Sequence, residues 1–68
     1  MNEFYLKGDY IKLGQLLKAA DLISNGSDAK FEILEGKVKV NEEITKQRGK
    51  KIISGDIVEY EGNVIHVH

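Results

Sequence analysis

The chain has 68 residues, no cysteine and a formal net charge of −1. This length is near the lower limit for a self-sufficient hydrophobic core, so we expect one domain over residues 1–68 and no deep catalytic pocket. The lack of cysteine excludes a disulfide framework and a thiolate zinc site. With neither a basic leader nor a long apolar run, we expect a cytoplasmic protein without a membrane partner.

The first half of the chain predicts a short strand and then a helix. Residues 4–6 are apolar or aromatic and precede the turn signal Gly8-Asp9, so a strand or an extended arm is expected from Glu3 to Leu6. Within residues 10–22, apolar side chains recur at helical spacing. The expected buried face of this helix consists of Leu13, Leu16, Leu17 and Ala20. Gly14 lies inside the same helix, where it lowers helix stability and suggests a close contact with another segment.

A second helix is predicted from Asp28 to Glu35, after a break at residues 24–27. Ser27 is a suitable N-cap, and Gly36 is placed to close the C-terminus. A helix of about two turns is unstable alone, so it must pack on the first helix. Its expected core positions are Ala29 and Ile33, with Phe31 or Leu34 as an additional candidate.

The second half predicts a small, mostly antiparallel sheet. Lysine and valine alternate over residues 37–40, which indicates a strand with the valines inward. Residues 41–43 turn the chain, and a short return segment begins at Ile44. Further strands are expected at residues 52–53, 57–61 and 64–67, the last two joined by a Gly62-Asn63 turn. The predicted fold class is α+β: two packed helices followed by this sheet.

Positive charge is concentrated in one part of the chain. Residues 37–51 contain six basic and two acidic residues, a balance of +4, whereas the remainder has a balance of −5. Such segregation indicates a polyanionic partner. Arg48 is the strongest single candidate because a guanidinium can donate two hydrogen bonds to one phosphate. The alternative is a solvated loop that keeps a small protein in solution.

Three segments occur in the order and spacing of the S4 RNA-binding domain. They are "KLGQLLKAADLI", "SNGSDAKFEILEGKVKVNEE" and "ISGDIVEY". Each segment alone is weak, but the ordered set resembles that family, and the resemblance extends over residues 10–60. More narrowly, "YIKLGQLLKAADLISNGSDAK" and "NEEITKQRGKKIISGDIV" resemble the small stand-alone bacterial S4-like proteins of the YaaA and YbcJ type. The resemblance implies an S4-like (alpha-L) fold that binds structured RNA, such as ribosomal RNA or tRNA.

The resemblance also implies specific contacts. The first basic residue of the motif falls on Lys12, and the basic residue after the motif alanine falls on Lys30. Gly26 stands where many S4 domains have a loop arginine, so a phosphate contact there would need backbone N–H groups, and Asp28 would oppose it. The complete predicted RNA-binding set is Lys12, Lys30, Lys37, Lys39, Lys46, Arg48, Lys50 and Lys51. The lysines of residues 37–39 could equally protect an edge strand, and the two helical lysines could be ordinary surface residues.

The remaining candidates favour structural roles. Asn41 is expected to form a turn. The aromatic residues are scattered, so most are expected in the core, with Tyr5 or Tyr10 as less favoured base-stacking candidates. His66 and His68 share a strand face but have too few companions for a metal site.

The sequence leaves three hypotheses for function. No nucleophile motif or phosphate-binding glycine loop is present, so we expect no catalysis, cofactor or small-molecule substrate. The favoured hypothesis is an RNA-binding protein. The alternatives are a protein–protein adaptor in ribosome assembly whose acidic face meets a basic ribosomal protein, and an S4 fold without an RNA role.

Overall fold

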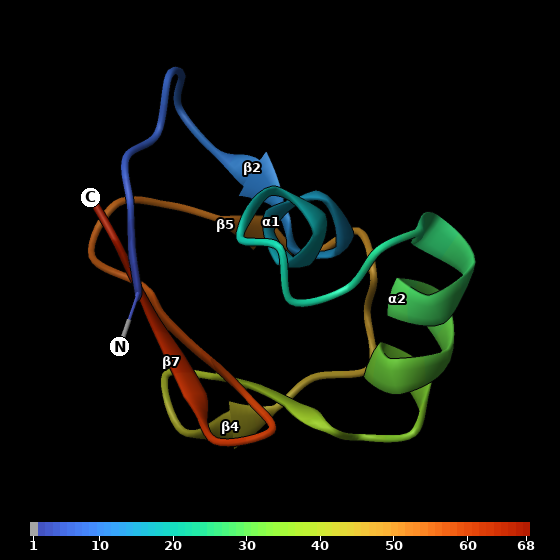
Figure 1. Ribbon diagram of the computed structural model, residues 1–68. Helices are drawn as coiled ribbons and strands as arrows, with labels where there is room; N and C mark the ends of the chain where they lie inside the picture. The colour runs from blue at the N-terminus through green and yellow to red at the C-terminus, as the bar shows by residue number, and fades with distance from the viewer. Residues whose placement is uncertain (1) are drawn as a thin grey trace.

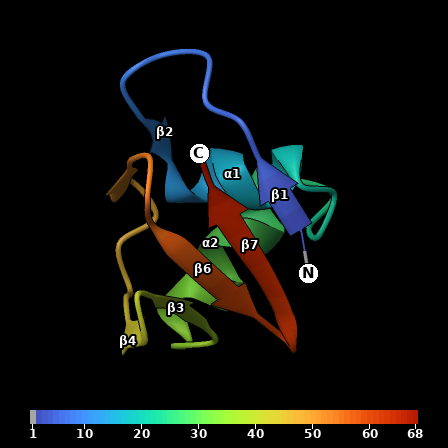
Figure 2. The ribbon, with the colours of Figure 1, turned by 90° about the vertical axis from the view of Figure 1, so that its left-hand side faces the viewer.

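The computed structural model describes residues 2–68, which form two helices and seven strands (Figure 1). The helices are α1 (Leu13–Ala19) and α2 (Gly26–Leu34). The strands are β1 (Asn2–Phe4), β2 (Ile11–Lys12), β3 (Val38–Val40), β4 (Glu43–Ile44), β5 (Lys51–Ile52), β6 (Ile57–Tyr60) and β7 (Asn63–Val67). Both helices lie on one face of the larger sheet (Figure 2). The predicted α+β class is therefore confirmed.

The larger sheet has five strands in the order β1-β7-β6-β3-β4, and β2 pairs with β5 separately. Only the β1–β7 pair is parallel; the other pairs are antiparallel. The mostly antiparallel sheet and the N-terminal strand are thus confirmed. The N-terminal strand ends at Phe4 rather than Leu6, because Phe4 pairs with Val67, the last residue of β7.

Helix α1 begins at Leu13, after the apolar pattern starts. The preceding Lys12 is extended, with φ −74° and ψ 144°, because β2 pairs with β5 instead of extending the helix. Leu13, Leu16 and Leu17 are completely buried, which confirms them as the predicted face, whereas Ala20 follows the last helical residue and is only partly buried. Asp21 adopts φ 62°, a left-handed conformation that closes the C-terminal end.

Helix α2 begins two residues earlier than predicted, at Gly26. Asn25 is the N-cap: its Oδ1 accepts a hydrogen bond from the Asp28 N–H at 2.9 Å, and its Nδ2 donates to Asp28 Oδ2 at 3.0 Å. The first bond satisfies one of the N–H groups that have no partner within the first turn, and the second holds the Asn25 side chain in place. Ser27 lies inside that turn, so its prediction as N-cap is wrong. Gly36 closes the other end with φ 76°, as predicted.

Fewer α2 side chains are buried in the core than the sequence suggested. Ala29 and Ile33 are buried, in agreement with the prediction. Phe31 and Leu34 are 65% and 49% exposed, so neither belongs to the core.

The Asn41 side chain connects the turn after β3 to the start of β6 through hydrogen bonds. Its Nδ2 donates to Asp56 Oδ1 at 3.0 Å, and its Oδ1 accepts from the Ile57 N–H at 2.9 Å. Asn41 itself adopts φ 51°. The structure therefore gives Asn41 the turn-forming role that the sequence favoured.

The β6–β7 hairpin turns one residue earlier than predicted. Tyr60 pairs with Asn63, so the two turn residues are Glu61 and Gly62, with φ 46° and 80°. Two consecutive positive φ angles match the right-handed twist of a hairpin. Helices and sheet share one core, which consists of Leu13, Leu16, Leu17, Ile23, Ala29, Ile33, Val38, Val40, Ile52, Val58, Tyr60, Ile65 and Val67.

Candidate nucleic-acid interface

The basic loop, residues 45–51, is fastened to the start of α1 by backbone hydrogen bonds. The Leu13 N–H donates to the Lys50 carbonyl at 2.9 Å, and the Gly14 N–H donates to the Arg48 carbonyl at 3.0 Å. The first N–H groups of a helix have no partner within the helix, and the loop supplies two. The loop is thereby held against α1.

A groove lies where α1, the start of α2 and the basic loop meet. Its volume is about 290 Å³. The lining contains three cationic side chains and no acidic one. Three lining residues are glycines, so they place no side chain in the groove. This basic groove is lined by Lys12, Gly14, Gln15, Lys18, Gly26, Ala29, Arg48 and Gly49.

Arg48 lies directly against the α1 backbone at Gly14. A Cβ atom on Gly14 would lie 2.9 Å from Arg48 Cγ and 3.5 Å from Arg48 Cδ. The close contact suggested by a glycine inside the helix is therefore confirmed, and its partner is the side chain singled out for phosphate binding. Because Gly14 has no side chain, the aliphatic part of the Arg48 side chain can pack directly on the α1 backbone.

Replacing Gly14 by alanine should separate RNA affinity from folding. The added methyl group would displace Arg48, so we expect the affinity for a hairpin RNA to fall by about tenfold, the equivalent of one weakened contact. Alanine improves helix propensity by up to about 1 kcal/mol, which offsets the steric cost, so the free energy of unfolding should change little. Fluorescence anisotropy and urea unfolding measure the two quantities.

Gly26→Ala is the matched control for this variant. It adds a methyl group to the α2 wall of the same groove, where nothing lies within 4 Å of the new atom. Equal losses of affinity in both variants would show that the position of Arg48 is not the cause.

Lys18 is a groove residue that the sequence analysis missed. It lies outside the basic segment, in the last turn of α1. The available signal was spacing: Lys12, Gln15 and Lys18 recur every three residues, which places neighbouring side chains on one side of a helix. All three line the groove.

The other lysines of the basic loop lie beside the groove and do not line it. Lys46 and Lys50 line a separate hollow that also contains Glu43. The Lys51 Nζ atom lies 4.9 Å from the centre of the Tyr10 ring, a cation–π contact. Lys30 is exposed on α2, next in sequence to a groove residue.

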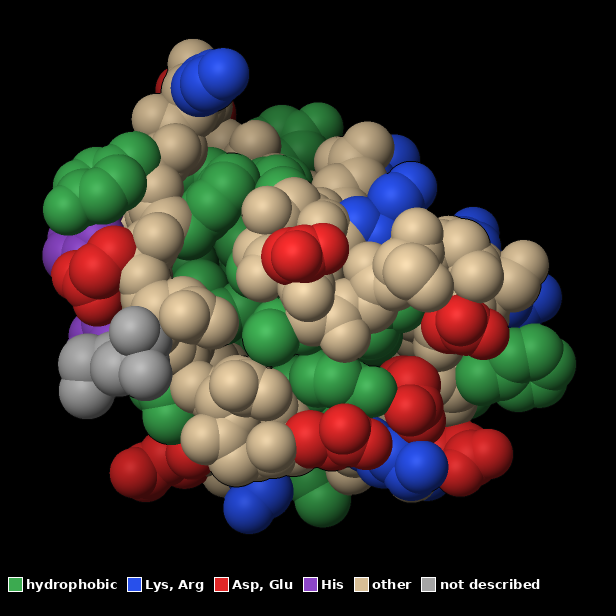
Figure 3. All heavy atoms as spheres, in the orientation of Figure 1, with side chains coloured by type: hydrophobic (Ala, Val, Ile, Leu, Met, Phe, Trp, Pro, Cys, Tyr) green, Lys and Arg blue, Asp and Glu red, His purple; other side chains and the backbone are tan. Residues whose placement is uncertain are grey.

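Lys37 and Lys39 occupy a different surface, among acidic side chains. Lys37 Nζ lies 3.1 Å from Glu32 Oε2 and 3.8 Å from Glu35 Oε2, and the Glu32 contact raises the pKa of the lysine. Lys39 lies opposite Glu59 in the β3–β6 pair. The predicted RNA-binding residues are therefore divided between two surfaces. Figure 3 shows basic side chains gathered between α1 and the start of α2, and acidic ones over much of the lower half.

The start of α2, which the sequence offered as a phosphate site, already uses one of its backbone N–H groups in a hydrogen bond. The Asp28 N–H is bonded to Asn25, and the Asp28 carboxylate lies in the same turn. Its negative charge would repel a phosphate, as the sequence analysis anticipated.

His68, at one end of the chain, contacts residues near the other end. His68 Nε2 lies 2.7 Å from Glu3 Oε1, and the His68 ring stacks on Tyr5 with 4.9 Å between ring centres.

Across residues 2–68, no three His, Cys, Asp or Glu side chains are grouped as metal ligands would be. Neither helix in this described range has the length and apolar composition needed to cross a bilayer.

Known proteins share this fold and sequence. The S4 domain family matches residues 4–68. A Bacillus subtilis (strain 168) relative, named "Probable ribosome maturation protein RlbA", is 44% identical over 61 residues, which are 90% of this chain and 86% of the relative. YbcJ of Escherichia coli (strain K12) is 33% identical over 61 residues, 90% of this chain and 87% of its own.

The solution structure of Escherichia coli YbcJ superposes with a TM-score of 0.75 at 34% identity, covering 98% of this chain and 86% of YbcJ. That structure is described as having an alpha-L motif involved in RNA binding. The resemblance stated from the sequence is confirmed over nearly the whole chain. The chain belongs to the S4 domain family.

Proposed function

We propose that this protein binds structured RNA, ribosomal RNA or tRNA, through the basic groove and catalyses no reaction. The observation that carries the proposal is the groove itself, where Lys12, Lys18 and Arg48 converge from two segments without an acidic neighbour in the lining. The alpha-L motif of YbcJ and the ribosome-related name of the Bacillus relative support an RNA partner. A-form RNA hides its base edges in a deep groove, so phosphate positions and shape select the ligand.

The other lysines of the predicted RNA-binding set contribute to RNA binding to different degrees. Lys46, Lys50 and Lys51 belong to the same loop as Arg48 and extend its positive charge, and Lys30 follows the groove residue Ala29. Lys37 and Lys39 contribute less, because the carboxylates beside them offset their charge. We propose that residues 1–68 act as one cytoplasmic domain in this role, with no cofactor or small-molecule substrate.

RNA affinity should fall steeply with salt concentration. Each neutralised phosphate releases counterions and lowers the binding constant by roughly 0.7 to 0.9 log units per decade of salt. The groove and the adjoining loop lysines should make about three to five such contacts. Anisotropy titrations of a hairpin RNA between about 50 and 200 mM salt measure the slope.

A single strand of the same base composition provides the comparison for shape. The hairpin should bind more tightly at every salt concentration if the groove reads a helical backbone. A flat salt response, or equal binding of both RNAs, would contradict the proposal and favour the adaptor hypothesis.

A further inference from the structure

Helix α2 presents two chemically different sides. Gly26 and Ala29 face the basic groove. Asp28, Phe31, Glu32 and Glu35 follow one another at i, i+3, i+4 and i+7, so they share another side of the helix. We call these four residues the acidic flank.

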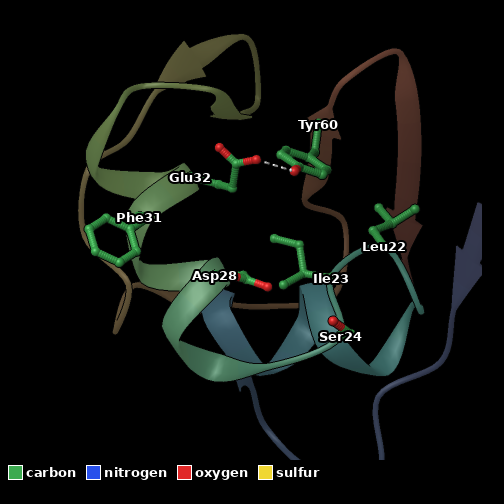
Figure 4. A pocket seen from close by; sticks show the side chains of 7 residues that line it. All are labelled: Leu22, Ile23, Ser24, Asp28, Phe31, Glu32 and Tyr60. Atoms are coloured by element: carbon green, nitrogen blue, oxygen red, sulfur yellow. Dashed lines mark hydrogen bonds between the residues drawn. The ribbon is translucent and has the colours of Figure 1, made fainter.

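A cavity of about 390 Å³ opens beside the acidic flank. Figure 4 shows Glu32 and Tyr60 pointing toward each other across it, while Ile23 and Asp28 also point inward. Phe31 lies at the rim, turned outward, with 65% of its surface exposed. The lining contains two carboxylates and no cation.

The cavity keeps its negative charge at neutral pH. The Tyr60 hydroxyl donates to Glu32 Oε1 at 2.8 Å, and this bond is the main cause of a lowered pKa for Glu32. Burial and the Glu32 contact raise the pKa of Tyr60, which therefore remains a neutral donor. Glu61 lies close enough to act on Tyr60 and adds a further negative charge. Lys37 Nζ lies 3.1 Å from Glu32 Oε2 and 3.8 Å from Glu35 Oε2, so this one cation reduces but does not cancel the charge of the four carboxylates on the acidic flank and at Glu61.

We propose that the acidic flank and its cavity dock an arginine-rich segment of a protein partner. One guanidinium of such a segment can donate hydrogen bonds to the Asp28 carboxylate at the cavity, and another can stack on the exposed ring of Phe31. Leucine side chains of the same segment can cover Leu22, the partly buried apolar residue of the cavity wall. The charge that attracts such a segment repels a phosphate backbone, so RNA is not the occupant. This site is separate from the RNA groove and does not depend on it.

The site is tested with the isotope-labelled protein and a short peptide of alternating arginine and leucine. Titration followed by backbone amide shifts should perturb residues of the acidic flank and Tyr60, whereas a hairpin RNA should perturb Gly14, Arg48 and Gly49. Phe31→Ser should weaken peptide binding by about tenfold, as removal of an aromatic anchor does, with RNA affinity unchanged.

Ile53→Ser is the matched control, since Ile53 is 52% exposed but lies outside α2 and does not line the cavity. It should leave peptide affinity within about twofold of the parent, the range of a neutral surface contact. Equal peptide affinity of the parent and Phe31→Ser would overturn the proposal, because the peptide would then bind through general charge attraction and not through this site. No peptide binding at low salt, or RNA-induced shifts on the acidic flank, would overturn it as well. Loss of RNA binding alone would refute the proposed function and leave this site intact.

Discussion

Reversing the charges at Lys18 and Arg48 to glutamate is expected to weaken binding of a hairpin RNA by at least about a hundredfold. Charge-assisted hydrogen bonds contribute about 1.5 to 3 kcal/mol each, and each reversal also adds repulsion. Two lost contacts amount to at least about 3 kcal/mol, where 1.4 kcal/mol is a factor of ten. Both side chains line the groove and neither is buried, so folding should be preserved. Anisotropy and circular dichroism test the two parts of this expectation.

The control is the pair Lys7→Glu and Lys39→Glu, which changes the net charge by the same amount. Both lysines are exposed, and neither lines the basic groove. Their reversal should reduce RNA affinity far less, through long-range attraction alone. If the two double variants lose affinity equally, general charge and not the groove binds RNA.

Replacing Leu16 by alanine is expected to destabilise the fold by about 2 to 5 kcal/mol, the range for a large buried side chain that leaves a cavity. Leu16 is completely buried between the helices and the sheet. A chain of this size is stabilised by roughly 3 to 10 kcal/mol in total. The variant should therefore unfold at much lower urea concentration and should be partly unfolded at body temperature.

Leu34→Ala removes the same atoms from the outside of α2. Leu34 is 49% exposed, so its loss should cost no more than about 0.5 kcal/mol. Should Leu16→Ala melt within a degree or two of the parent, the assignment of Leu16 to the core would be refuted.

Local patterns predicted the elements well, but their ends depended on tertiary contacts. The leucine spacing of α1 identified its buried face from the sequence. Its first residue could not be predicted, because Ile11 and Lys12 are helix-compatible and become a strand only by pairing with β5. In the inter-helix break, Asn25 and Ser27 are both good N-caps by residue type. The structure uses Asn25, whose side chain makes two hydrogen bonds to Asp28. The Glu61-Gly62 turn places a non-glycine residue at φ 46°, which composition alone disfavours.

The candidate site was predicted less completely than the fold. The sequence located the basic loop and Arg48, because charge is concentrated there along the chain. It grouped Lys37 and Lys39 with that loop, but Lys37, just before β3, and Lys39, within β3, lie on a surface shared with Glu32 and Glu59. Linear charge density does not specify which side of a strand or helix faces which neighbour. Lys18 was missed for the same reason, since folding brings it from another segment to the groove.

The hydrogen bonds from the start of α1 to the Arg48 and Lys50 carbonyls have a thermodynamic consequence. They join two parts of the groove that are more than thirty residues apart in sequence, so the unfolded chain has no such site. A ligand that binds only the native state raises its stability by RT ln(1 + [L]/Kd), about 2.7 kcal/mol at a hundredfold excess over Kd. RNA should therefore protect this small protein from proteolysis and should restore much of the folding that Leu16→Ala loses. Each protein molecule would then persist longest where its RNA is present.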